Sequence, residues 1–349
     1  MHLVIVSMNM SLRRIIIVCS VFSFLVFGCG LQKEVVISGR TMGTTYHIKI
    51  ITGYFNKLSG LKPKIDQRLE AINQSMSTYR PDSEISRFNS IQDITTLVPI
   101  SDDFLKVMQT AQRLYELSDG AWDGTVKPLV NLWGFGNTHK PRAKPDTAVI
   151  KDTIRTVGFK YIRIIENGLL QKHVEKLSLD LASIAKGFAV DQISELLKAE
   201  GLDNFLVEIG GEIYAAGYRK DGSPWRVGIN QPDSNATLLE TYKVVALHNQ
   251  AMATSGDYRN YFEIDGQRYS HIINPRTGYP VNNGVVSASV VAESCMFADG
   301  LATALMVMGP KDGLNLVASL NGVAALIVVR NEDHSLSPFA SENFDALTQ

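Results

Sequence analysis

The stretch "SCMFADGLATALMV" (residues 294–307) decides how this chain folds and where its chemistry is expected. Its apolar residues are typical of a buried helix, which Gly309-Pro310 is expected to end. A single carboxylate, Asp299, lies among them, and the stretch contains no Lys, Arg or His. Burying an unpaired carboxylate costs on the order of several kcal/mol, so Asp299 needs a proton or a cation partner.

Three further helices are predicted from apolar periodicity. They cover 61–75, 102–118 and the residues that follow "DLAS" (180–183). Ser101 can cap the second of these helices, and the two aspartates after Ser101 suit the positive end of the helix dipole. The chain therefore alternates amphipathic helices with other segments.

Short apolar or alternating runs between these helices predict strands. Asp265-Gly266 lies between two β-rich arms and predicts a two-residue hairpin turn. The clearest strands cover 45–50, 205–209, 285–291 and 323–329. Helices mixed with local hairpins predict an α+β fold, with mixed or antiparallel sheets and packed helices.

A metal site is one interpretation of the helix at 294–307. Asp299 and Thr303 are four residues apart, so they share one helix face. A carboxylate and a hydroxyl are hard oxygen donors that suit Mg²⁺, an ion that joins protein to phosphate. In the alternative interpretation, Thr303 bonds back to the carbonyl of Asp299, and Asp299 caps a neighbouring loop.

The segment "LDLASIAKGFAVD" (179–191) is a candidate phosphate site. Asp180 and Ser183 precede or begin a helix, and Lys186 lies just inside it. A helix N-terminus attracts phosphate, and a lysine adds a positive charge. An ordinary capped helix with a solvated lysine is the alternative. The sequence has neither a P-loop nor a dinucleotide-binding glycine motif, so a nucleotide would have to bind in another way.

His271 ends the second arm of the predicted hairpin, just before the tight loop Asn274–Gly278. A histidine beside a polar loop can bind a ligand or move a proton near neutral pH. A histidine that only bonds to the backbone is the simpler alternative.

The N-terminus is typical of a secretion signal. Arg13 and Arg14 precede the apolar run 15–27, which is too short for a bilayer span. "VFGC" resembles a bacterial lipobox, so residues 1–28 are predicted to be a lipoprotein signal peptide and Cys29 the lipidated first residue. An ordinary cleaved signal and a short anchor are the alternatives.

The net charge bears on the possible binding partners, and the cysteine content bears on possible disulfides. With 34 basic and 35 acidic residues the net charge is −1, which gives no electrostatic footprint for nucleic acid. Of the three cysteines, Cys19 would be removed with the signal and Cys29 would carry lipid. Cys295 is then left alone, so no intramolecular disulfide is expected.

Eight motifs occur in an order that resembles the ApbE family, the FAD:protein FMN transferases of the bacterial envelope. They run from about Gly39 to Gly309, and they are "TMGTTY", "MSTYRPDSEISRFN", "GAWDGTVKPLVNLWGFG", "DLASIAKGFAVD", "VEIGGEIYAAG", "ATSGDYRNYF", "HIINPRTGYPV" and "ADGLATAL". The resemblance implies an ApbE-like (T-fold-like) architecture for 29–349. This unit is a single catalytic domain or two closely packed subdomains that hold FAD between them.

The resemblance also implies an activity: with Mg²⁺, FAD is split, FMN moves to a Thr or Ser hydroxyl of an acceptor protein, and AMP is released. Flavin and adenine contacts would fall on Met42, Tyr79, Ala121, Trp122, Asp123, Asp180, Lys186 and His271 or its neighbour Ile272. The metal would be held by Asp299 and Thr303, with a further oxygen from Ser183, and would be the missing countercharge of Asp299. Asp299 and His271 are both candidates for accepting the proton of the attacking hydroxyl.

Two other functions remain compatible with these residues. The first is a Mg²⁺-dependent FAD pyrophosphatase, in which water replaces the acceptor hydroxyl. The second is a non-catalytic flavin-binding envelope lipoprotein. By the resemblance, acceptors are flavoprotein subunits of envelope redox complexes, and the enzyme is lipid-anchored and faces the periplasm. The residue after the lipidated cysteine is Gly30 and not an aspartate, which by the resemblance favours the outer over the inner membrane.

Overall fold

The computed structural model describes residues 31–136, 142–165, 168–233, 237, 240–257 and 260–348. The predicted signal peptide and Cys29 lie outside these ranges. Within them, no helix has the length and the apolar character needed to cross a bilayer.

The main sheet has eight strands, and every neighbouring pair is antiparallel. This agrees with the predicted α+β class. In spatial order the strands are β1 (Gln32–Thr41), β2 (Thr44–Gly53), β6 (Phe205–Ile209), β7 (Glu212–Ala216), β10 (Gln250–Gly256), β13 (Val285–Ala292), β14 (Ala324–Arg330) and β15 (Leu336–Ala340).

Three smaller antiparallel units flank the main sheet. Their strands are β3 (Val98–Pro99), β5 (Leu169–Lys172) and β4 (Ile162–Ile165) in one sheet, β8 (Trp225–Asn230) and β9 (Thr241–Leu247) in a second, and β11 (Tyr261–Ile264) and β12 (Gln267–Ser270) in a third. The turn between β11 and β12 is Asp265-Gly266, and both residues have positive φ, as the sequence predicts for a two-residue hairpin.

Seven α-helices occur in the described ranges. They are α2 (Leu61–Met76), α3 (Glu84–Ser90), α4 (Asp102–Leu117), α5 (Lys127–Leu132), α6 (Thr147–Ile154), α7 (Ala182–Ala199) and α8 (Cys295–Ala318), and short 3₁₀ turns lie at Phe159–Tyr161 and Asp345–Leu347. The helices predicted at 61–75, at 102–118 and after "DLAS" are α2, α4 and α7. Ser101 caps α4 as expected.

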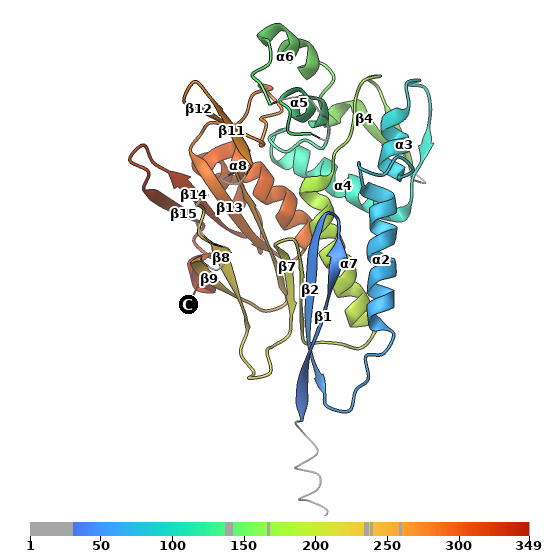
Figure 1. The fold of residues 1–349 in the computed structure, drawn as a ribbon, viewed down its shortest axis with the longest axis vertical. Helices are drawn as coiled ribbons and strands as arrows, with labels where there is room; N and C mark the ends of the chain where they lie inside the picture. The colour runs from blue at the N-terminus through green and yellow to red at the C-terminus, as the bar shows by residue number, and fades with distance from the viewer. Residues whose placement is uncertain are drawn as a thin grey trace, which may run out of the picture.

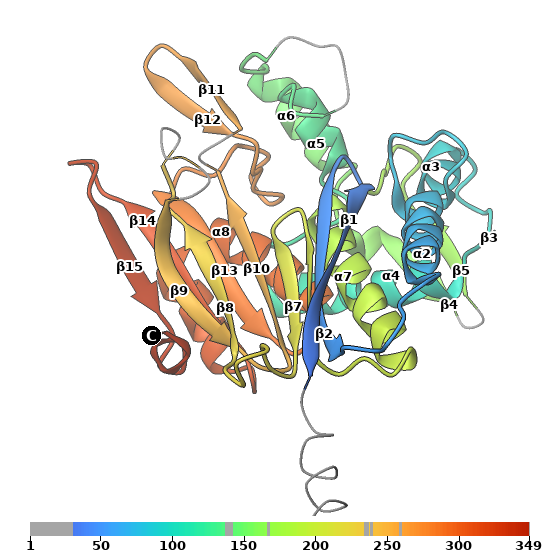
Figure 2. The ribbon, with the colours of Figure 1, turned by 60° about the horizontal axis from the view of Figure 1, so that its bottom comes forward.

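Both faces of the main sheet are covered (Figures 1 and 2). Helices α7 and α8 pack on one face, where the buried residues include Ile48, Val207 and Val290. The β8–β9 pair packs on the other face, against residues such as Val291. Because successive strand residues point to opposite faces, both faces must be apolar, and all eight residues of β13 are buried.

A third, smaller core lies under α5, α6 and the β11–β12 hairpin. It is built on Leu129, Trp133, Ile150, Tyr269 and Ile273. The rings of Trp133 and Tyr269 stack with centroids 5.4 Å apart. This small core holds the segment that carries His271 beside the main sheet.

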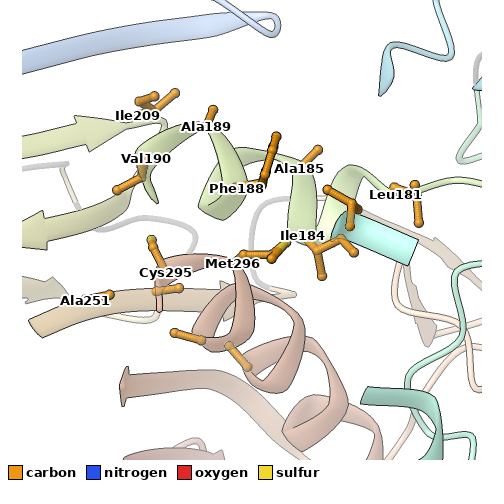
Figure 3. Packing of buried hydrophobic residues seen from close by; sticks show 14 of the residues in the cluster. Leu181, Ile184, Ala185, Phe188, Ala189, Val190, Ile209, Ala251, Cys295 and Met296 are labelled. Carbon is orange, nitrogen blue, oxygen red and sulfur yellow. The ribbon is translucent and has the colours of Figure 1, made fainter. Parts of the chain in front are cut away.

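Helices α7 and α8 approach closely because glycine lies at their contact. A Cβ on Gly187 would be 2.4 Å from the Cys295 carbonyl oxygen, and one on Gly300 would be 2.6 Å from Cγ2 of Ile184 on α7. Figure 3 shows the buried side chains of α7 beside Cys295 and Met296 at the start of α8. This contact fixes the position of the α8 turn that carries Asp299.

The polypeptide leaves helical geometry at Gly309 (φ 79°, ψ 175°), which confirms the predicted end of the first helical segment. A second helical segment, which was not predicted, follows Pro310 and continues to Ala318. Proline suits the first turn of this segment because an N–H there has no partner within the helix.

Candidate active site

A cavity of about 430 Å³ opens where α7 begins, beside α8 and the end of β10. Of the predicted site residues, those that line the cavity are Ala121, Trp122, Asp123, Asp180, Ser183, Lys186, His271, Ile272, Asp299 and Thr303. Segments far apart in the sequence therefore meet in one concave site, as a binding pocket requires.

Asp299 has a cationic neighbour that its own helix does not provide. Lys186 Nζ lies 3.8 Å from Asp299 Oδ2, and the backbone N–H of Gly187 donates to the same oxygen at 3.0 Å. Helix α7 therefore supplies a lysine and an N–H to Asp299, and the role of Mg²⁺ as a countercharge stays a prediction.

A second carboxylate, Glu212, shares the lysine. Lys186 Nζ lies 3.0 Å from Glu212 Oε1, whereas Glu212 Oε2 is buried and has no hydrogen-bond partner among the described residues. One ammonium group thus faces two carboxylates, and one carboxylate oxygen still lacks a partner. Such an arrangement favours a further cation or a proton.

The pKa shifts follow from this crowding. Burial raises the pKa of Asp299, and Lys186 and the Gly187 N–H oppose that rise. Burial and then the charge of Asp299 raise the pKa of Glu212 to about 8. Burial acts to lower the pKa of Lys186, but the charges of Asp299 and Glu212 outweigh it, so that pKa is raised and the lysine stays charged.

The oxygen atoms in the cavity wall suit a Mg²⁺ ion that takes only a few of its ligands from the protein. Asp299 and Thr303 line the same wall of the cavity, and Thr303 Oγ1 lies 3.0 Å from Ser255 Oγ of β10. No group of three or more His, Cys, Asp and Glu side chains within the described ranges is arranged to hold a metal. Mg²⁺ commonly uses one or two carboxylates and completes its shell with water and substrate phosphate. The unpartnered Glu212 oxygen nearby is consistent with that chemistry.

Trp122 and Asp123 make hydrogen bonds that hold the wall of the cavity in place. The indole N–H of Trp122 donates to Ser183 Oγ at 3.0 Å, which fixes the first turn of α7. Asp123 Oδ1 accepts from the N–H and hydroxyl of Thr125, and its Oδ2 accepts from Phe159 N–H. Burial raises the pKa of Asp123. Both oxygens of this carboxylate therefore hold the surrounding loop together.

Asp180 organises the start of α7. Its Oδ1 accepts from Ala182 N–H at 3.0 Å, and its own N–H donates to the Gly124 carbonyl at 2.7 Å. Ala182 and Ser183, the first residues of this long helix, both line the cavity. The N-terminus of α7 and Lys186 therefore face the same space, as the interpretation of a phosphate site expects.

His271 is fixed by one of its ring nitrogens. Nδ1 lies 3.2 Å from the Asn260 carbonyl oxygen, which can only accept, so Nδ1 carries the hydrogen and Nε2 holds a lone pair. Burial lowers the pKa of His271, and Arg142 lowers it further, so the ring is neutral near pH 7. Its bond to the backbone, which was the simpler alternative, leaves the second nitrogen available for chemistry.

Met42 and Tyr79 are not among the residues that line this cavity. Met42 lies in the β1–β2 turn with φ 49°, and Tyr79 is an exposed residue between α2 and α3. Their predicted contacts with the dinucleotide are therefore not part of the cavity wall, and they stay predictions.

Several wall residues were missed from the sequence. The most important are Glu212, Gly210 and the end of β10, Thr254–Gly256. Glu212 carried a usable signal, because it is the only charged residue in "EIYAA", a fully buried strand. The same reasoning that selected Asp299 applies to it.

Comparison with known proteins agrees with the geometry of the site. The model of the ApbE family matches residues 42–327. The chain belongs to the ApbE family. Among relatives of this ApbE chain, the "FAD:protein FMN transferase" of Vibrio cholerae is 45% identical over 92% of this chain and 95% of its own length. The protein of the same name from Escherichia coli is 33% identical over 93% and 95%.

Solved ApbE structures have the same fold. The flavin transferase ApbE of Vibrio cholerae superposes with a TM-score of 0.82 at 42% identity, covering 90% of this chain and 99% of that one. The apo form of the Pseudomonas stutzeri flavinyl transferase ApbE gives a TM-score of 0.81 at 38% identity, covering 90% and 97%. The ApbE-like architecture expected from the sequence is therefore confirmed.

Proposed function

We propose that this chain transfers FMN from FAD to a Thr or Ser hydroxyl of an acceptor protein and releases AMP. The observation that carries the proposal is the charge cluster of Lys186, Glu212 and Asp299 beside the N-terminus of α7, in one cavity. The names of the ApbE relatives support the same activity. The negatively charged oxygens of a pyrophosphate are stabilised by positive charge close to them. This wall provides a fixed lysine and a helix N-terminus.

The reaction replaces the phosphoanhydride oxygen on the phosphorus of the FMN half with an ester oxygen from the acceptor. The acceptor oxygen bonds to the phosphorus of the FMN half, and the bond from that phosphorus to the bridging oxygen breaks, so AMP leaves. Such transfers depend mostly on alignment and on compensation of charge. Lys186 and the first N–H groups of α7 are placed to orient the diphosphate, and Trp122 holds that turn of the helix still.

The acceptor hydroxyl must lose its proton as it attacks. We assign His271 Nε2 as the base, because Nδ1 is bonded to a carbonyl and burial keeps the ring neutral. Asp299 is less suited, because its Oδ2 already accepts from Gly187 N–H and faces Lys186. These hydrogen bonds support His271 over Asp299 as the base in this proposal.

Asp299, Thr303 and an oxygen of Ser183 would hold Mg²⁺, with Glu212 close enough in the same wall to add negative charge. Bound there, the ion would neutralise charge on the diphosphate and on the departing AMP. The structural support is the chemistry of the donors and the unpartnered oxygen of Glu212.

The cellular setting follows from the N-terminal sequence. We propose that residues 1–28 are removed, that Cys29 carries lipid, and that the enzyme acts in the periplasm on flavoprotein subunits of envelope redox complexes. The motif around Cys29 supports this location.

The test is incubation of the full chain with FAD and Mg²⁺, with and without a candidate acceptor. FMN bound covalently to a hydroxyl residue, detected by mass spectrometry together with free AMP, supports the transferase. Free FMN in equal amounts with and without acceptor would instead identify a pyrophosphatase. FAD that binds but is never cleaved would identify a flavin-binding protein.

Asp299→Asn separates chemistry from folding in this assay. It keeps the shape of the side chain but removes the charge, so turnover is expected to fall by about a hundredfold or more and to lose its dependence on Mg²⁺. Asp203→Asn, at an exposed aspartate outside the cavity wall, is the matched control and should leave turnover unchanged. Unaltered metal dependence in Asp299→Asn would remove this helix from the mechanism.

A further inference from the structure

Two aromatic rings are exposed on the turn that follows β2. Tyr54 is 57% exposed and Phe55 is 84% exposed, and their rings meet edge to face with centroids 5.5 Å apart. Leu31, at the start of β1 beside them, is 72% exposed. These three residues, which we name the apolar tip, lie outside the cavity wall and outside the three buried cores.

The turn that presents the apolar tip is well fixed. Tyr54 N–H donates to the Leu31 carbonyl at 2.8 Å, and Asn56 N–H donates to the Gly53 carbonyl at 3.0 Å. The Asn56 side chain donates to Thr52 Oγ1, and Lys33 Nζ donates to the Asn56 carbonyl. Because the backbone of the turn is held in this way, the rings are held out toward solvent by a fixed scaffold. An apolar group in such a place is typical of a contact surface.

Two lysines lie beside the apolar tip. Lys33 Nζ lies 5.9 Å from the centre of the Tyr54 ring, and Lys57 follows the turn as an exposed residue. The loop before β6 lies nearest to the end of β2, where its Asn204 carbonyl accepts from Ile51 N–H at 2.8 Å, and it carries the exposed Asp203. The loop after β7, at the same end of the main sheet, carries Arg219 and Lys220, although Asp221 lies 3.5 Å from Arg219. Figures 1 and 2 both place the ends of β2 and β7 at one end of the main sheet.

The position of the apolar tip in the chain indicates its partner. Leu31 is the second residue after Cys29, the proposed site of lipid attachment. A chain anchored at residue 29 cannot move residue 31 far from the bilayer, since two extended residues span only about 7 Å. Leu31 in turn is hydrogen-bonded to Tyr54. The apolar tip is thus tied to the membrane end of the chain by both sequence and structure.

We infer that the apolar tip rests in the headgroup region of a phospholipid bilayer that contains anionic lipid. The inference rests on the lipid anchor in the proposed function. Aromatic rings with polar neighbours favour the membrane–water interface, and lysines are attracted to anionic headgroups. A second contact of this kind would orient the chain that the lipid anchor holds at the membrane.

This contact fixes the direction in which the active site faces. At the other end of β2, a Cβ on Gly210 would lie 2.8 Å from the methyl of Thr44, and Gly210 lines the cavity. The ten residues of β2 separate that end from the apolar tip, a distance of about 30 Å for an extended strand. The cavity therefore faces away from the lipid, and an acceptor must present its hydroxyl well above the membrane surface.

The test measures the depth of a single labelled position in the lipidated full chain. Phe55→Cys is labelled with a fluorophore and reconstituted into vesicles of phosphatidylcholine and phosphatidylglycerol, some of it spin-labelled near the headgroup. Cys295 is buried, and a lipidated Cys29 does not react, so the label goes to position 55. The matched control is Val149→Cys, on α6 at the opposite end of the molecule (Figure 1).

Fluorescence at position 55 is expected to fall roughly twofold or more with spin-labelled lipid, and fluorescence at position 149 to stay nearly constant. Equal quenching at both positions, no quenching at 55, or a chain that does not float with the vesicles would overturn the inference. FAD turnover is measured in the same samples. It reports folding, and it shows separately whether the proposed enzymatic function holds.

Discussion

Lys186 Nζ lies 3.0 Å from Glu212 Oε1, and this pair joins α7 to the first residue of β7 at the wall of the cavity. Asp299, from α8, approaches the same ammonium group at 3.8 Å. Three elements thus bring two acids and one base into a buried space. Burial and the negative charge of Asp299 raise the pKa of Glu212 to about 8. Without a further cation, a proton on Glu212 therefore leaves one carboxylate to face the one ammonium group.

Glu212→Gln is expected to change how stability depends on pH. In the wild type, the pKa of Glu212 is about 8 in the folded chain, so the carboxyl keeps its proton until the pH approaches that value. The reference pKa of a glutamate is 4.5. This contribution to stability is therefore present below pH 4.5 and is lost as the pH rises to about 8. Glutamine cannot lose that proton, so the melting temperature of the variant should fall less between about pH 5 and about pH 9.

The measurement is thermal unfolding with chelator present, so that no divalent cation occupies the site. Glu263→Gln, at an exposed residue of β11, is the control and should follow the wild type at every pH. Parallel curves for wild type and Glu212→Gln would show that Glu212 does not hold a proton in the folded chain.

His271→Gln is expected to lower kcat for FMN transfer by about a hundredfold to ten-thousandfold, the usual contribution of a general base. The KM for FAD should change much less, because the proposed diphosphate contacts come from α7 and α8. Burial lowers the pKa of His271, so the acid limb of the wild-type rate profile should lie below the reference value of 6.5.

Steady-state kinetics of FMN attachment across pH check this assignment. His173→Gln, at an exposed histidine after β5, is the control and should keep wild-type rates. If His271→Gln retains the acid limb with an unchanged kcat, the base must be another group.

Gly187→Ala is expected to destabilise the fold and to displace Asp299. The new Cβ would lie 2.4 Å from the Cys295 carbonyl oxygen, which is backbone and cannot rotate away. Overpacking of this kind costs about 1–3 kcal/mol, and separation of the helices would break the N–H bond to Asp299.

Urea unfolding and FAD turnover together report both effects. Gly53→Ala is the matched control, because a Cβ there would meet Asn56 only at the ordinary contact distance of 3.5 Å. Wild-type stability in Gly187→Ala would mean that the two helices can separate without cost.

Asp191→Ala removes hydrogen bonds that support the start of α8, whose N-cap residue is Ser294. Asp191 accepts from the Ser294 hydroxyl and from the N–H groups of Cys295 and Met296. Loss of these bonds should cost about 2 kcal/mol and should loosen the turn that leads to Asp299. The KM for Mg²⁺ is therefore expected to rise.

Ser101→Ala removes the cap of α4, which lies outside the cavity wall, and is the comparison. It should lower stability in urea but leave the KM for Mg²⁺ unchanged. Similar KM values in both variants would show that the hydrogen bonds of Asp191 do not position Asp299.

Local signals in the sequence were sufficient for several elements. The strand at Phe205–Ile209 lies where the apolar run predicts it, and α4 begins after the expected serine cap. The helix that carries Asp299 breaks at Gly309, as Gly-Pro requires. In each case the pattern depends on neighbours within one or two turns, which a sequence displays directly.

Other features depend on contacts between distant segments. Glu212 and Lys186 are 26 positions apart in the sequence, and no pattern in the residues around either one predicts that they pair. The β8–β9 pair covers the second face of the main sheet, and its strands were not predicted because each is only partly apolar. Met42 and Tyr79 were expected at the dinucleotide, but the fold places them outside the cavity wall.

The sequence by itself determined that one helix buries an acid and that a second helix begins with groups suited to phosphate. It also determined the family, because eight motifs occur in a specific order. Only the tertiary structure decided which charges compensate Asp299 and which nitrogen of His271 is available. Charge compensation and hydrogen bonding act over a few ångströms in space, and folding brings residues to that distance without regard to their separation along the chain.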